Sequence, residues 1–288
     1  MIDVSGSRVI KVLGVSALSL FAIAAMAEDT LGLSESLYSI GAPEITQAPS
    51  STASPWRFSV GGGVVNMPKF PGASGTKWEG VPVVSASYDR FFIGSNPDAA
   101  SILSLGAYLY RDSNWRIGAA VTYDFIQPRS ESDDSRLQGL GDVKRTAHAE
   151  LFGIYTYEFI SARASVLTDI AGNDRGTVAT FDVLGRYQPI PALTLSAGPG
   201  LTWASSKYNE TYFGVTSEQS SRSGLPTYSA GSGLNELRFS VNGAYRITPR
   251  VNVGASVSFA WLRGDATDSP ITEKTSQITY GLFLNYLF

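Results

Sequence analysis

The stretch "VNVGASVSFAW", residues 251–261, alternates between two kinds of side chain along its whole length. One face is apolar, with Val251, Val253, Ala255, Val257, Phe259 and Trp261; the other has Asn252, Gly254, Ser256, Ser258 and Ala260. A period of two residues is typical of a β-strand whose two faces meet different surroundings. The same pattern recurs in 115–125, 180–187, 194–203 and 236–247. The chain is therefore predicted to be all-β and antiparallel.

Three features favour a membrane-spanning barrel over a secreted sandwich. The alternating runs are about 10 to 14 residues long, which suits a tilted strand that crosses a bilayer. Short connections (111–114, 158–161, 188–192 and 246–250) alternate with long polar ones (127–143, 207–232 and 264–274), as in outer-membrane barrels. Aromatic residues gather at the strand ends, where interfacial girdles are expected: Trp56, Trp115, Tyr123, Tyr155, Tyr157, Tyr187, Trp203, Tyr245 and Trp261.

The predicted fold is a transmembrane antiparallel up-and-down β-barrel of the outer-membrane type with about twelve strands. An even number places both ends of the barrel on the periplasmic side and every long loop outside the cell. The weakest strand is 90–95; if it is only a turn, about ten strands remain. The expected strands are 56–66, 78–89, 90–95, 101–110, 115–126, 144–157, 161–170, 177–188, 192–206, 233–246, 250–263 and 275–288.

The amino terminus resembles an export signal. Arg8 and Lys11 precede an apolar stretch at 12–24, and Ala25-Met26-Ala27 matches the small-x-small cleavage pattern. A membrane anchor or a buried helix is the alternative, but the stretch is short for a span of about 20 apolar residues. We expect a signal peptide over 1–27 that is cleaved after Ala27, a flexible periplasmic leader over 28–55 and a barrel over 56–288, located in the cell outer membrane after export through the inner membrane.

Composition excludes several classes of function. Of the 288 residues, 16% are charged, the formal net charge is −3, and no run of Lys or Arg occurs, so the electrostatic footprint of a nucleic-acid-binding protein is missing. The chain contains no cysteine. Disulfides, thiolate metal sites and a cysteine nucleophile are therefore excluded.

The faces opposite the apolar ones are expected to line a lumen. Both signs of charge are interspersed there, which favours a small lumen filled by ion pairs over a single-sign ring that selects a solute, although a selective pore remains an alternative. The predicted lumen residues are Arg57, Arg116, Asp124, His148, Glu150, Arg163, Asp169, Asp182, Arg186, Glu236, Arg238 and Arg246.

No motif indicates catalysis, a cofactor or a metal centre. His148 is the only histidine, so a multi-histidine metal site is excluded and a catalytic triad would depend on this residue alone. The chain has no G-x-S-x-G motif, and a hydrogen-bonded lumen histidine is the simpler interpretation. Glycines 61–63 are followed by no Lys-Ser/Thr pair, so a curved strand explains them better than a phosphate loop. We predict a non-enzymatic protein.

Several short stretches in order resemble the MipA/OmpV family of outer-membrane proteins. They are "LQGLGDV" (137–143), "YFGV" (212–215), "SGLPTYSAGSGL" (223–234), "GDATDSPI" (264–271) and the terminal aromatic strand. The resemblance runs from about Trp56 to Phe288 and implies an outer-membrane barrel. The eponymous member of the family is described as a scaffold that links a lytic transglycosylase to a murein synthase, and other members are regarded as outer-membrane antigens or adhesins.

The stretches that carry the resemblance fall largely in extracellular loops. Tyr212, Phe213, Gly214 and Gly224 belong to the longest loop, where the glycines favour turns and the aromatic rings could fold back onto the barrel mouth. Asp265 and Asp268 lie in the last loop and could hydrogen-bond within it. A Ca²⁺ site there is an alternative, but two carboxylates fall short of a full oxygen shell.

The resemblance implies a structural or scaffolding role with a link to murein (peptidoglycan) synthesis and turnover, and a murein synthase or lytic transglycosylase as partner. Short periplasmic turns offer little surface for a standard interface of roughly 800 Å² per partner, so we expect the leader 28–55 and the barrel rim to carry any such contact. Two alternatives remain open. One is a narrow, porin-like channel for small solutes, and the other is a surface adhesin or antigen that acts through its extracellular loops.

The chain ends in "GLFLNYLF", residues 281–288. Tyr280, Leu282, Leu284, Tyr286 and Phe288 share one face, so the ending is expected to be the last lipid-facing strand, paired with the strand that begins at Trp56. A terminal aromatic residue, with Tyr286 two positions before Phe288, also resembles the signal by which the barrel-assembly machinery recognises its substrates during insertion.

Overall fold

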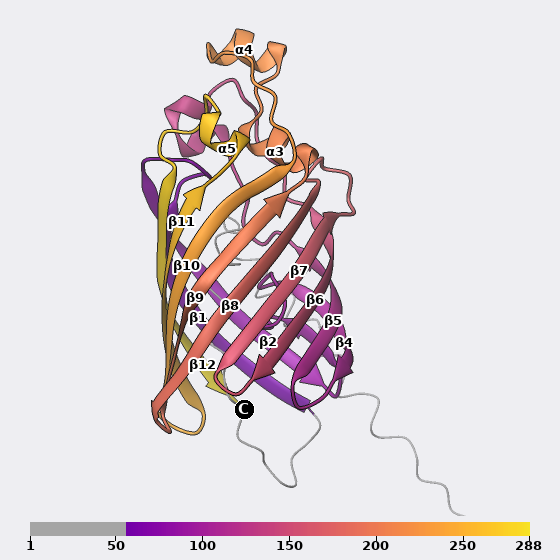
Figure 1. Ribbon diagram of the computed structural model, residues 1–288, viewed down its shortest axis with the longest axis vertical. Coiled ribbons are helices and arrows are strands. Elements are labelled where there is room, and N and C mark those ends of the chain that lie inside the picture. The colour runs from indigo at the N-terminus through magenta and orange to yellow at the C-terminus, as the bar shows by residue number, and fades with distance from the viewer. Residues whose placement is uncertain (1–55) are drawn as a thin grey trace, which may run out of the picture. The chain divides into compact units, whose positions relative to one another are not determined.

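The computed structural model describes residues 56–288, which form a closed antiparallel barrel of twelve strands. Each strand pairs with its neighbours in sequence, and β12 pairs with β1 to close the sheet (Figure 1). The predicted barrel and the predicted pairing of the last strand with the first are confirmed. The predicted signal peptide 1–27 with its cleavage after Ala27, and the predicted leader 28–55, lie outside the described residues.

The strands agree with the alternating runs of the sequence, and the weakest predicted one is formed as β3. The twelve-strand prediction is therefore confirmed and the ten-strand alternative is wrong. The strands are β1 (Trp56–Pro68), β2 (Thr76–Tyr88), β3 (Phe91–Gly94), β4 (Ser104–Arg111), β5 (Trp115–Tyr123), β6 (Ala147–Tyr157), β7 (Ile160–Asp169), β8 (Thr177–Ile190), β9 (Leu193–Ala204), β10 (Gly233–Arg246), β11 (Val251–Leu262) and β12 (Ser276–Leu287).

Short helices occur only in the long connections of the described chain. They are η1 (Glu131–Asp133), η2 (Ser135–Leu137), α3 (Ser206–Phe213), α4 (Ser217–Ser223) and α5 (Asp265–Asp268). Each of the two longer helices begins at a hydroxyl residue that accepts a backbone hydrogen bond, Ser205 for α3 and Thr216 for α4. Among residues 56–288, no helix has the length and the apolar content needed to cross a membrane.

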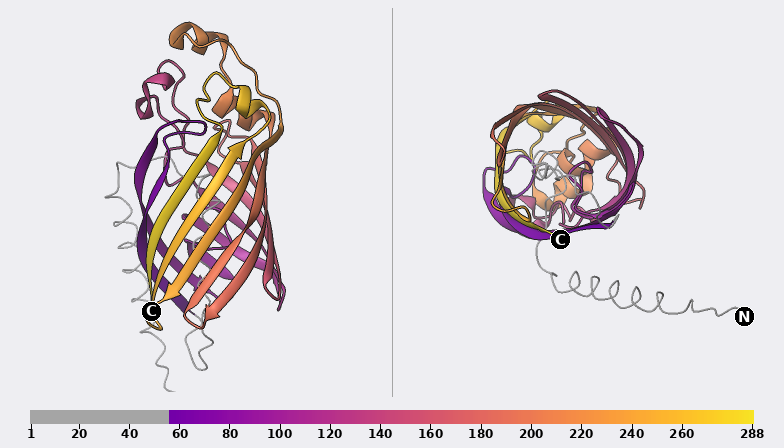
Figure 2. Two further views of the ribbon diagram at one scale, coloured as in Figure 1. Left: turned by 60° about the vertical axis from the view of Figure 1, so that its left-hand side comes forward. Right: turned by 90° about the horizontal axis from the view of Figure 1, so that it is seen from below.

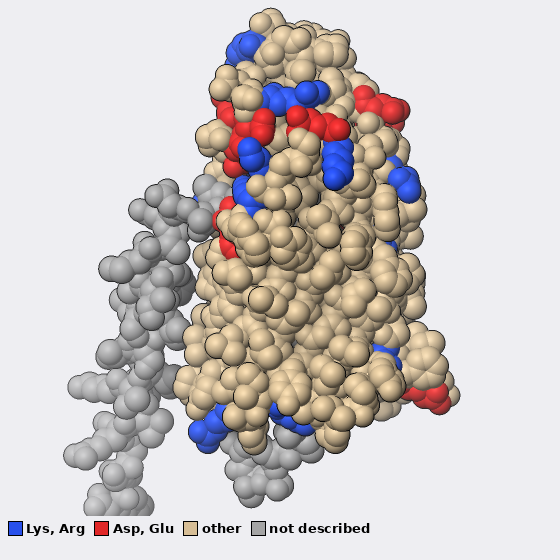
Figure 3. Space-filling view, turned by 90° about the vertical axis from the view of Figure 1, so that its left-hand side faces the viewer, with Lys and Arg blue, Asp and Glu red and all other residues tan. Residues whose placement is uncertain are grey.

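The outward face of the barrel is apolar. Val64, Leu105, Leu151, Phe181 and Leu282 are among its exposed large side chains. In the space-filling view, charged side chains gather at the two ends and leave an uncharged band between them (Figure 3). An apolar band with charged ends matches the hydrocarbon core and the two interfaces of a bilayer.

The glycines at 61–63 lie where the barrel closes. Gly61 pairs with Asn285 and Gly63 with Phe283 across the β1–β12 contact. A Cβ atom on Gly61 would collide with the backbone oxygen of Leu284, and one on Gly63 would collide with the ring of Phe283. Close approach of the two strands therefore requires glycine, as expected for small residues in a strongly curved sheet.

The long connections pack together into a cap over the extracellular end. We define the cap as residues 69–75, 124–146, 205–232 and 263–275. In the view from below, helical ribbons of these connections lie within the outline of the barrel (Figure 2). Two buried apolar clusters hold the cap together: Val143, Val178, Ala204, Tyr208, Tyr212, Phe213, Ala230, Leu262 and Ala266, and Phe70, Ala73, Leu137, Leu140, Val215 and Ile271.

The lumen has two unlike walls. Along β1–β6, apolar side chains form two further clusters, one around Val65 that Phe283 of β12 joins, and one around Phe92 and Phe152. Along β7–β12, the buried positions are mainly small and polar, as Ser165, Thr180, Ser240, Ser256 and Ser258. One wall therefore resembles a packed core, and the other resembles the lining of a hydrophilic lumen.

Candidate functional site

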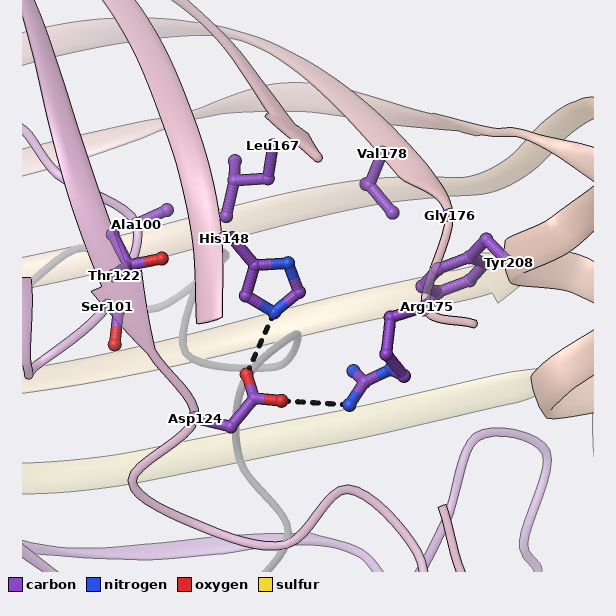
Figure 4. Close-up of a pocket in the computed structure, with 10 residues that line it drawn as sticks. All are labelled: Ala100, Ser101, Thr122, Asp124, His148, Leu167, Arg175, Gly176, Val178 and Tyr208. Atoms are coloured by element: carbon purple, nitrogen blue, oxygen red, sulfur yellow. Dashed lines mark hydrogen bonds and ion pairs between the residues drawn. The ribbon is translucent and has the colours of Figure 1, made fainter. Parts of the chain in front are cut away.

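A cluster of buried charges lies directly beneath the cap. Asp124 follows β5, His148 belongs to β6 and Arg175 lies between β7 and β8. One carboxylate oxygen of Asp124 is 3.1 Å from His148 Nε2, and the other accepts a hydrogen bond from Arg175 Nη1 at 2.8 Å (Figure 4). The side chains of Asp124 and Arg175 are only 2% and 1% exposed. Burial at this depth makes the ion pair costly to break, because either partner alone would be a desolvated charge.

Arg175 also connects this cluster to the cap. Its Nη1 donates to the Lys144 backbone oxygen at 3.1 Å, and its guanidinium lies 5.0 Å from the ring centroid of Tyr212 in α3. A guanidinium at this distance is attracted by the aromatic face. One side chain therefore ties together the β7–β8 connection and two loops of the cap.

Asp169, at the end of β7, shapes the connection that presents Arg175. Its carboxylate accepts hydrogen bonds from the Thr146 hydroxyl at 2.6 Å and from the backbone N–H groups of Ala171 and Arg175 at 2.9 and 3.0 Å. Side chains that accept local backbone hydrogen bonds stabilise tight turns. Asp169 therefore acts as a turn former at the barrel mouth.

A second buried arginine anchors the cap from within. Arg129 Nη1 donates to the Tyr212 backbone oxygen at 2.9 Å, and the backbone of Arg129 bridges to Val143 in the same loop. Burial lowers the pKa of Arg129 to about 10, so this guanidinium stays cationic at neutral pH. A buried cation bonded to the backbone of α3 holds this helix against the 124–146 loop.

The cavity around His148 is too small for an organic substrate. It has a volume of about 20 Å³ and is lined by Ser101, Thr122, Asp124, His148 and Tyr208, among others. This volume suits one water molecule, and the buried hydroxyl of Thr122 has no hydrogen-bond partner within the described chain. Ser101 Oγ donates to the Tyr123 backbone oxygen at 3.0 Å. The arrangement is that of a hydrogen-bonded lumen histidine.

The connection between β3 and β4, residues 95–103, is held against the lumen wall by charged side chains. Asp98 forms two hydrogen bonds with Arg116 on β5, at 2.7 and 3.1 Å, and accepts another from the Tyr108 hydroxyl at 2.8 Å. The buried carboxylate of Glu150 on β6 accepts from the Ala100 backbone N–H at 3.0 Å. Two of the predicted lumen residues, Arg116 and Glu150, therefore fix an inward-folded segment.

A third charged group bridges β8, β9 and β10. Arg238 Nε and Nη2 both donate to one oxygen of Asp182, at 3.0 and 2.7 Å, and Nη1 donates to the Thr202 hydroxyl at 2.7 Å. Glu236 lies 3.5 Å from Arg238 Nη1. The structure thus brings together three of the predicted lumen residues: Asp182, Glu236 and Arg238.

The remaining predicted lumen residues are arginines nearer the periplasmic end. Arg57 is exposed near the start of β1, and Arg163, Arg186 and Arg246 are partly buried on β7, β8 and β10. Arg163 is the register partner of Asp182, and Arg246 Nη2 donates to the Pro191 backbone oxygen at 2.7 Å. Arg163 therefore lies beside the group of Asp182, Glu236 and Arg238.

The loop residues singled out by sequence lie inside the cap. Tyr212 and Phe213 are buried at its centre, Gly214 follows α3, and Gly224 ends α4 in the left-handed conformation with a φ of 77°. Asp265, in α5, accepts a hydrogen bond from the Gly231 backbone N–H at 2.6 Å, and Asp268 ends the same helix. Between residues 56 and 288, no group of three or more His, Asp or Glu side chains is placed to hold a metal ion.

The carboxyl-terminal aromatic residues lie at the periplasmic edge of the closing strand. The rings of Tyr286 and Phe288 pack edge to face with centroids 4.9 Å apart. Phe288 is 75% exposed, while its backbone N–H donates to the Phe58 oxygen at 3.1 Å. The last residue therefore continues the β1–β12 pairing.

Sequence reasoning missed the partners that complete these clusters. Asp98, Arg129 and Arg175 lie in connections without periodicity, so no pattern indicated which way their side chains point. The predicted lumen residues also did not include the amides Asn252 and Asn285, although the alternation of both strands placed these two residues opposite the apolar face. The available signal was a polar residue at an inward position of a strand.

Comparison with known proteins identifies the family of this barrel. The family model described as MltA-interacting protein MipA matches residues 60–288, which covers nearly the whole described chain. The chain belongs to the MipA family. The resemblance seen in the sequence is thereby confirmed, and this MipA-family protein is an outer-membrane protein with a transmembrane β-barrel.

Two relatives and one solved structure illustrate how far the likeness extends. The MltA-interacting protein of Escherichia coli strain K12 is 26% identical over 196 residues, which cover 68% of this chain and 75% of that protein. Outer membrane protein Omp26La of Vibrio anguillarum is 28% identical over 214 residues, covering 69% and 70%. The NanC porin is similar in structure with a TM-score of 0.39 and 10% identity, over 80% of this chain and 98% of that one.

Proposed function

We propose that this MipA-family barrel is a non-enzymatic structural protein of the cell envelope that acts as a scaffold with a link to murein synthesis and turnover. The observation that carries the proposal is the cap. Its two buried apolar clusters and the Arg175–Asp124 ion pair give the extracellular end the packing of a folded core. A barrel whose outer end is built in this way suits a fixed body in the membrane better than a route for solutes.

The link to murein rests on family membership. A relative at 26% identity carries the name MltA-interacting protein, and a murein synthase or lytic transglycosylase is the corresponding partner class for this chain. The described periplasmic turns contain only two to four residues. A partner would therefore contact the barrel rim together with the leader 28–55, whose residues lie outside the described part of the chain.

Crosslinking in intact envelopes tests the scaffold. A photoreactive residue is introduced at several positions of 28–55 and at Glu158 on a periplasmic turn, and captured proteins are identified by mass spectrometry. We expect recovery of a murein synthase or lytic transglycosylase from these positions but not from Glu218 on α4, which lies in the cap. Recovery of no murein enzyme from any periplasmic position would contradict the scaffold.

A narrow solute channel is the second candidate, favoured by the polar wall of β7–β12. Ser165, Thr180, Ser240 and Ser258 are buried on that wall, which a packed barrel could have filled with apolar side chains. Single-channel recording in planar bilayers separates the two functions. The scaffold predicts a silent barrel that starts to conduct only when 205–232 is shortened, whereas stable conductance of the intact protein would favour the channel.

A further inference from the structure

Two rows of polar side chains cross the lumen wall in the periplasmic half of the barrel. In the first row, Arg246 of β10 is the register partner of Asn252 on β11, and Asn252 is the partner of Asn285 on β12. In the second, Asn242 of β10 is the partner of Ser256 on β11. Neighbouring strands lie about 4.8 Å apart, so the first row alone presents polar groups over roughly 10 Å.

Three of these side chains are buried, and several polar atoms of the two rows have no hydrogen-bond partner in the described chain, although the Asn242 amide donates to Ser196 Oγ at 3.4 Å. Asn252, Ser256 and Asn285 are 9%, 3% and 7% exposed. Both side-chain polar atoms of Asn285, the Asn252 amide nitrogen, the Asn242 amide oxygen and the Ser256 hydroxyl have no partner within the described chain. Buried polar atoms without partners cost about 1–3 kcal/mol each, so their gathering on one wall calls for an explanation.

The same wall has an excess of positive charge. The strand segments within 183–204, 237–262 and 276–288 contain no Asp or Glu, whereas Arg186, Arg238 and Arg246 lie on them. Arg238 is paired with Asp182, towards the cap. The Arg246 guanidinium donates to the Pro191 backbone oxygen, and no carboxylate of the described residues forms an ion pair with it.

We propose that Arg246, Asn242, Asn252, Ser256 and Asn285 form a binding site for an acidic amino sugar in the periplasmic half of the lumen. Arg246 binds the carboxylate in a charge-assisted pair, for which a planar guanidinium is well suited. The three amides and the hydroxyl supply both donors and acceptors, which is what a ligand rich in hydroxyl and acetamido groups requires.

The ligand reaches this site from the periplasm. The cap closes the other end with packed apolar clusters, whereas the described periplasmic turns, at 89–90, 112–114, 158–159, 191–192 and 247–250, contain only two to four residues each. The site is independent of the scaffold proposal, since it requires only the lumen wall. A carboxylate-bearing sugar is nonetheless the chemistry that a murein-linked protein would meet on that side of the membrane.

Calorimetric titration of the full-length protein, folded in detergent, tests the site. The probes are N-acetylmuramic acid, which carries a lactyl carboxylate, and N-acetylglucosamine, which is the same sugar without it. We expect the acidic sugar to bind and the neutral sugar to bind at least about tenfold more weakly. We also expect the affinity for the acidic sugar to fall as the salt concentration rises, because its carboxylate pairs with a cation.

Matched variants assign the binding to the proposed residues. Arg246→Gln should weaken binding of the acidic sugar about ten- to a hundredfold, because one charge-assisted hydrogen bond is lost. Arg250→Gln removes the same charge four residues away, in the β10–β11 turn, and should leave the affinity unchanged. Asn252→Ala, which keeps the charge of Arg246, should weaken the binding of both sugars. Heat-modifiable migration of each variant establishes that its barrel is folded.

Three outcomes would overturn the site. One is equal affinity for the two sugars, and another is an equal effect of the Arg246 and Arg250 variants. The third is no detectable binding of either sugar by folded protein. A failure to capture a murein enzyme by crosslinking would count against the scaffold but would leave these binding results unaffected, so the two proposals fail separately.

Discussion

The cap and the periplasmic half of the lumen both contain asparagine side chains, but several amide atoms on the lumen wall have no partner in the described chain, unlike those of Asn209. In the cap, Asn209 donates to the Gly231 backbone oxygen at 2.7 Å and accepts a hydrogen bond from Asn235. In the lumen wall, neither polar atom of the Asn285 side chain has a partner in the described chain. Polar groups that are satisfied internally stabilise a structure, whereas those left open are available to something outside it.

Charged side chains also differ between the cap and the periplasmic half of the lumen. Near the cap, Asp124, Arg175 and Arg129 are each bound to another part of the protein, and these contacts run between different loops. In the periplasmic half, Arg246 lies among segments of β8–β12 that contain no Asp or Glu. The extracellular end is therefore organised for rigidity, and the lumen wall is organised for contact with a solute.

The largest expected effect comes from breaking the buried ion pair beneath the cap. Asp124→Ala removes the carboxylate that contacts both Arg175 and His148. Removal of one partner of a buried pair costs about 3–5 kcal/mol, because the other charge stays desolvated. Urea unfolding of the folded barrel in lipid vesicles, followed by tryptophan fluorescence, should show a loss of this size.

Glu218→Ala is the matched control for this loss. Glu218 pairs with Arg222 on the exposed surface of α4, where its side chain is 79% exposed. Surface pairs of this kind contribute about 0.3–0.5 kcal/mol. Equal losses in the two variants would mean that the charges beneath the cap do not stabilise the fold.

The asparagine comparison itself predicts effects of intermediate size. Asn209→Leu leaves the Gly231 oxygen and the Asn235 amide without their partner in a buried place, so the free energy of unfolding should fall by about 1–3 kcal/mol. Asn285→Leu removes two buried polar atoms that bond to nothing in the described chain, so it should leave the stability unchanged or raise it. The same unfolding experiment measures both variants.

Similar destabilisation by the two leucine substitutions would remove the distinction between the cap and the lumen wall. Asn285→Leu has a second expected consequence, since the proposed site loses one of its amides. Binding of the acidic sugar should weaken in this variant while its stability is kept. A gain in stability with a loss of binding is the expected mark of a functional position.

Sequence predicted the barrel better than it predicted the cap. Alternation as in 251–261 fixes strand direction and face at every second residue, so the lipid-facing and lumen-facing sets followed directly. The cap lacks such periodicity. Its helices contain only three to eight residues. The longest is stabilised by burial of Tyr212 and Phe213 against other loops, which are contacts between segments far apart in the chain.

The candidate sites divide in the same way. The inward positions of Arg238 and Arg246 follow from the strand period, but their partners do not. Asp182 approaches Arg238 only because β8 and β10 flank β9 in the closed sheet. That the Asn285 side chain and the Asn252 amide nitrogen have no partner in the described chain is a property of three-dimensional packing, which no pattern along the sequence contains.

The smallest expected effect concerns a pair at the edge of the cap. Lys69 Nζ is 3.0 Å from Asp134 and joins the β1–β2 connection to the 124–146 loop. The hydrogen bond from Lys69 lowers the pKa of Asp134 below its ordinary value. Because both side chains are partly exposed, Lys69→Ala should cost only about 0–1 kcal/mol at pH 7.

The pH dependence of this small loss follows from the direction of the shift. A carboxyl group whose pKa is lowered in the folded protein adds stability above its unfolded value, near 3.9 for aspartate, and this contribution disappears as the pH falls through the folded value. The difference between wild type and Lys69→Ala should therefore be full at pH 7 and shrink below about pH 4. Lys274→Ala, in the last loop of the cap, is the control and should show no such convergence. A difference that persists at pH 3 would indicate that Lys69 acts through its packing, and the edge of the cap would then depend on apolar contacts as its interior does.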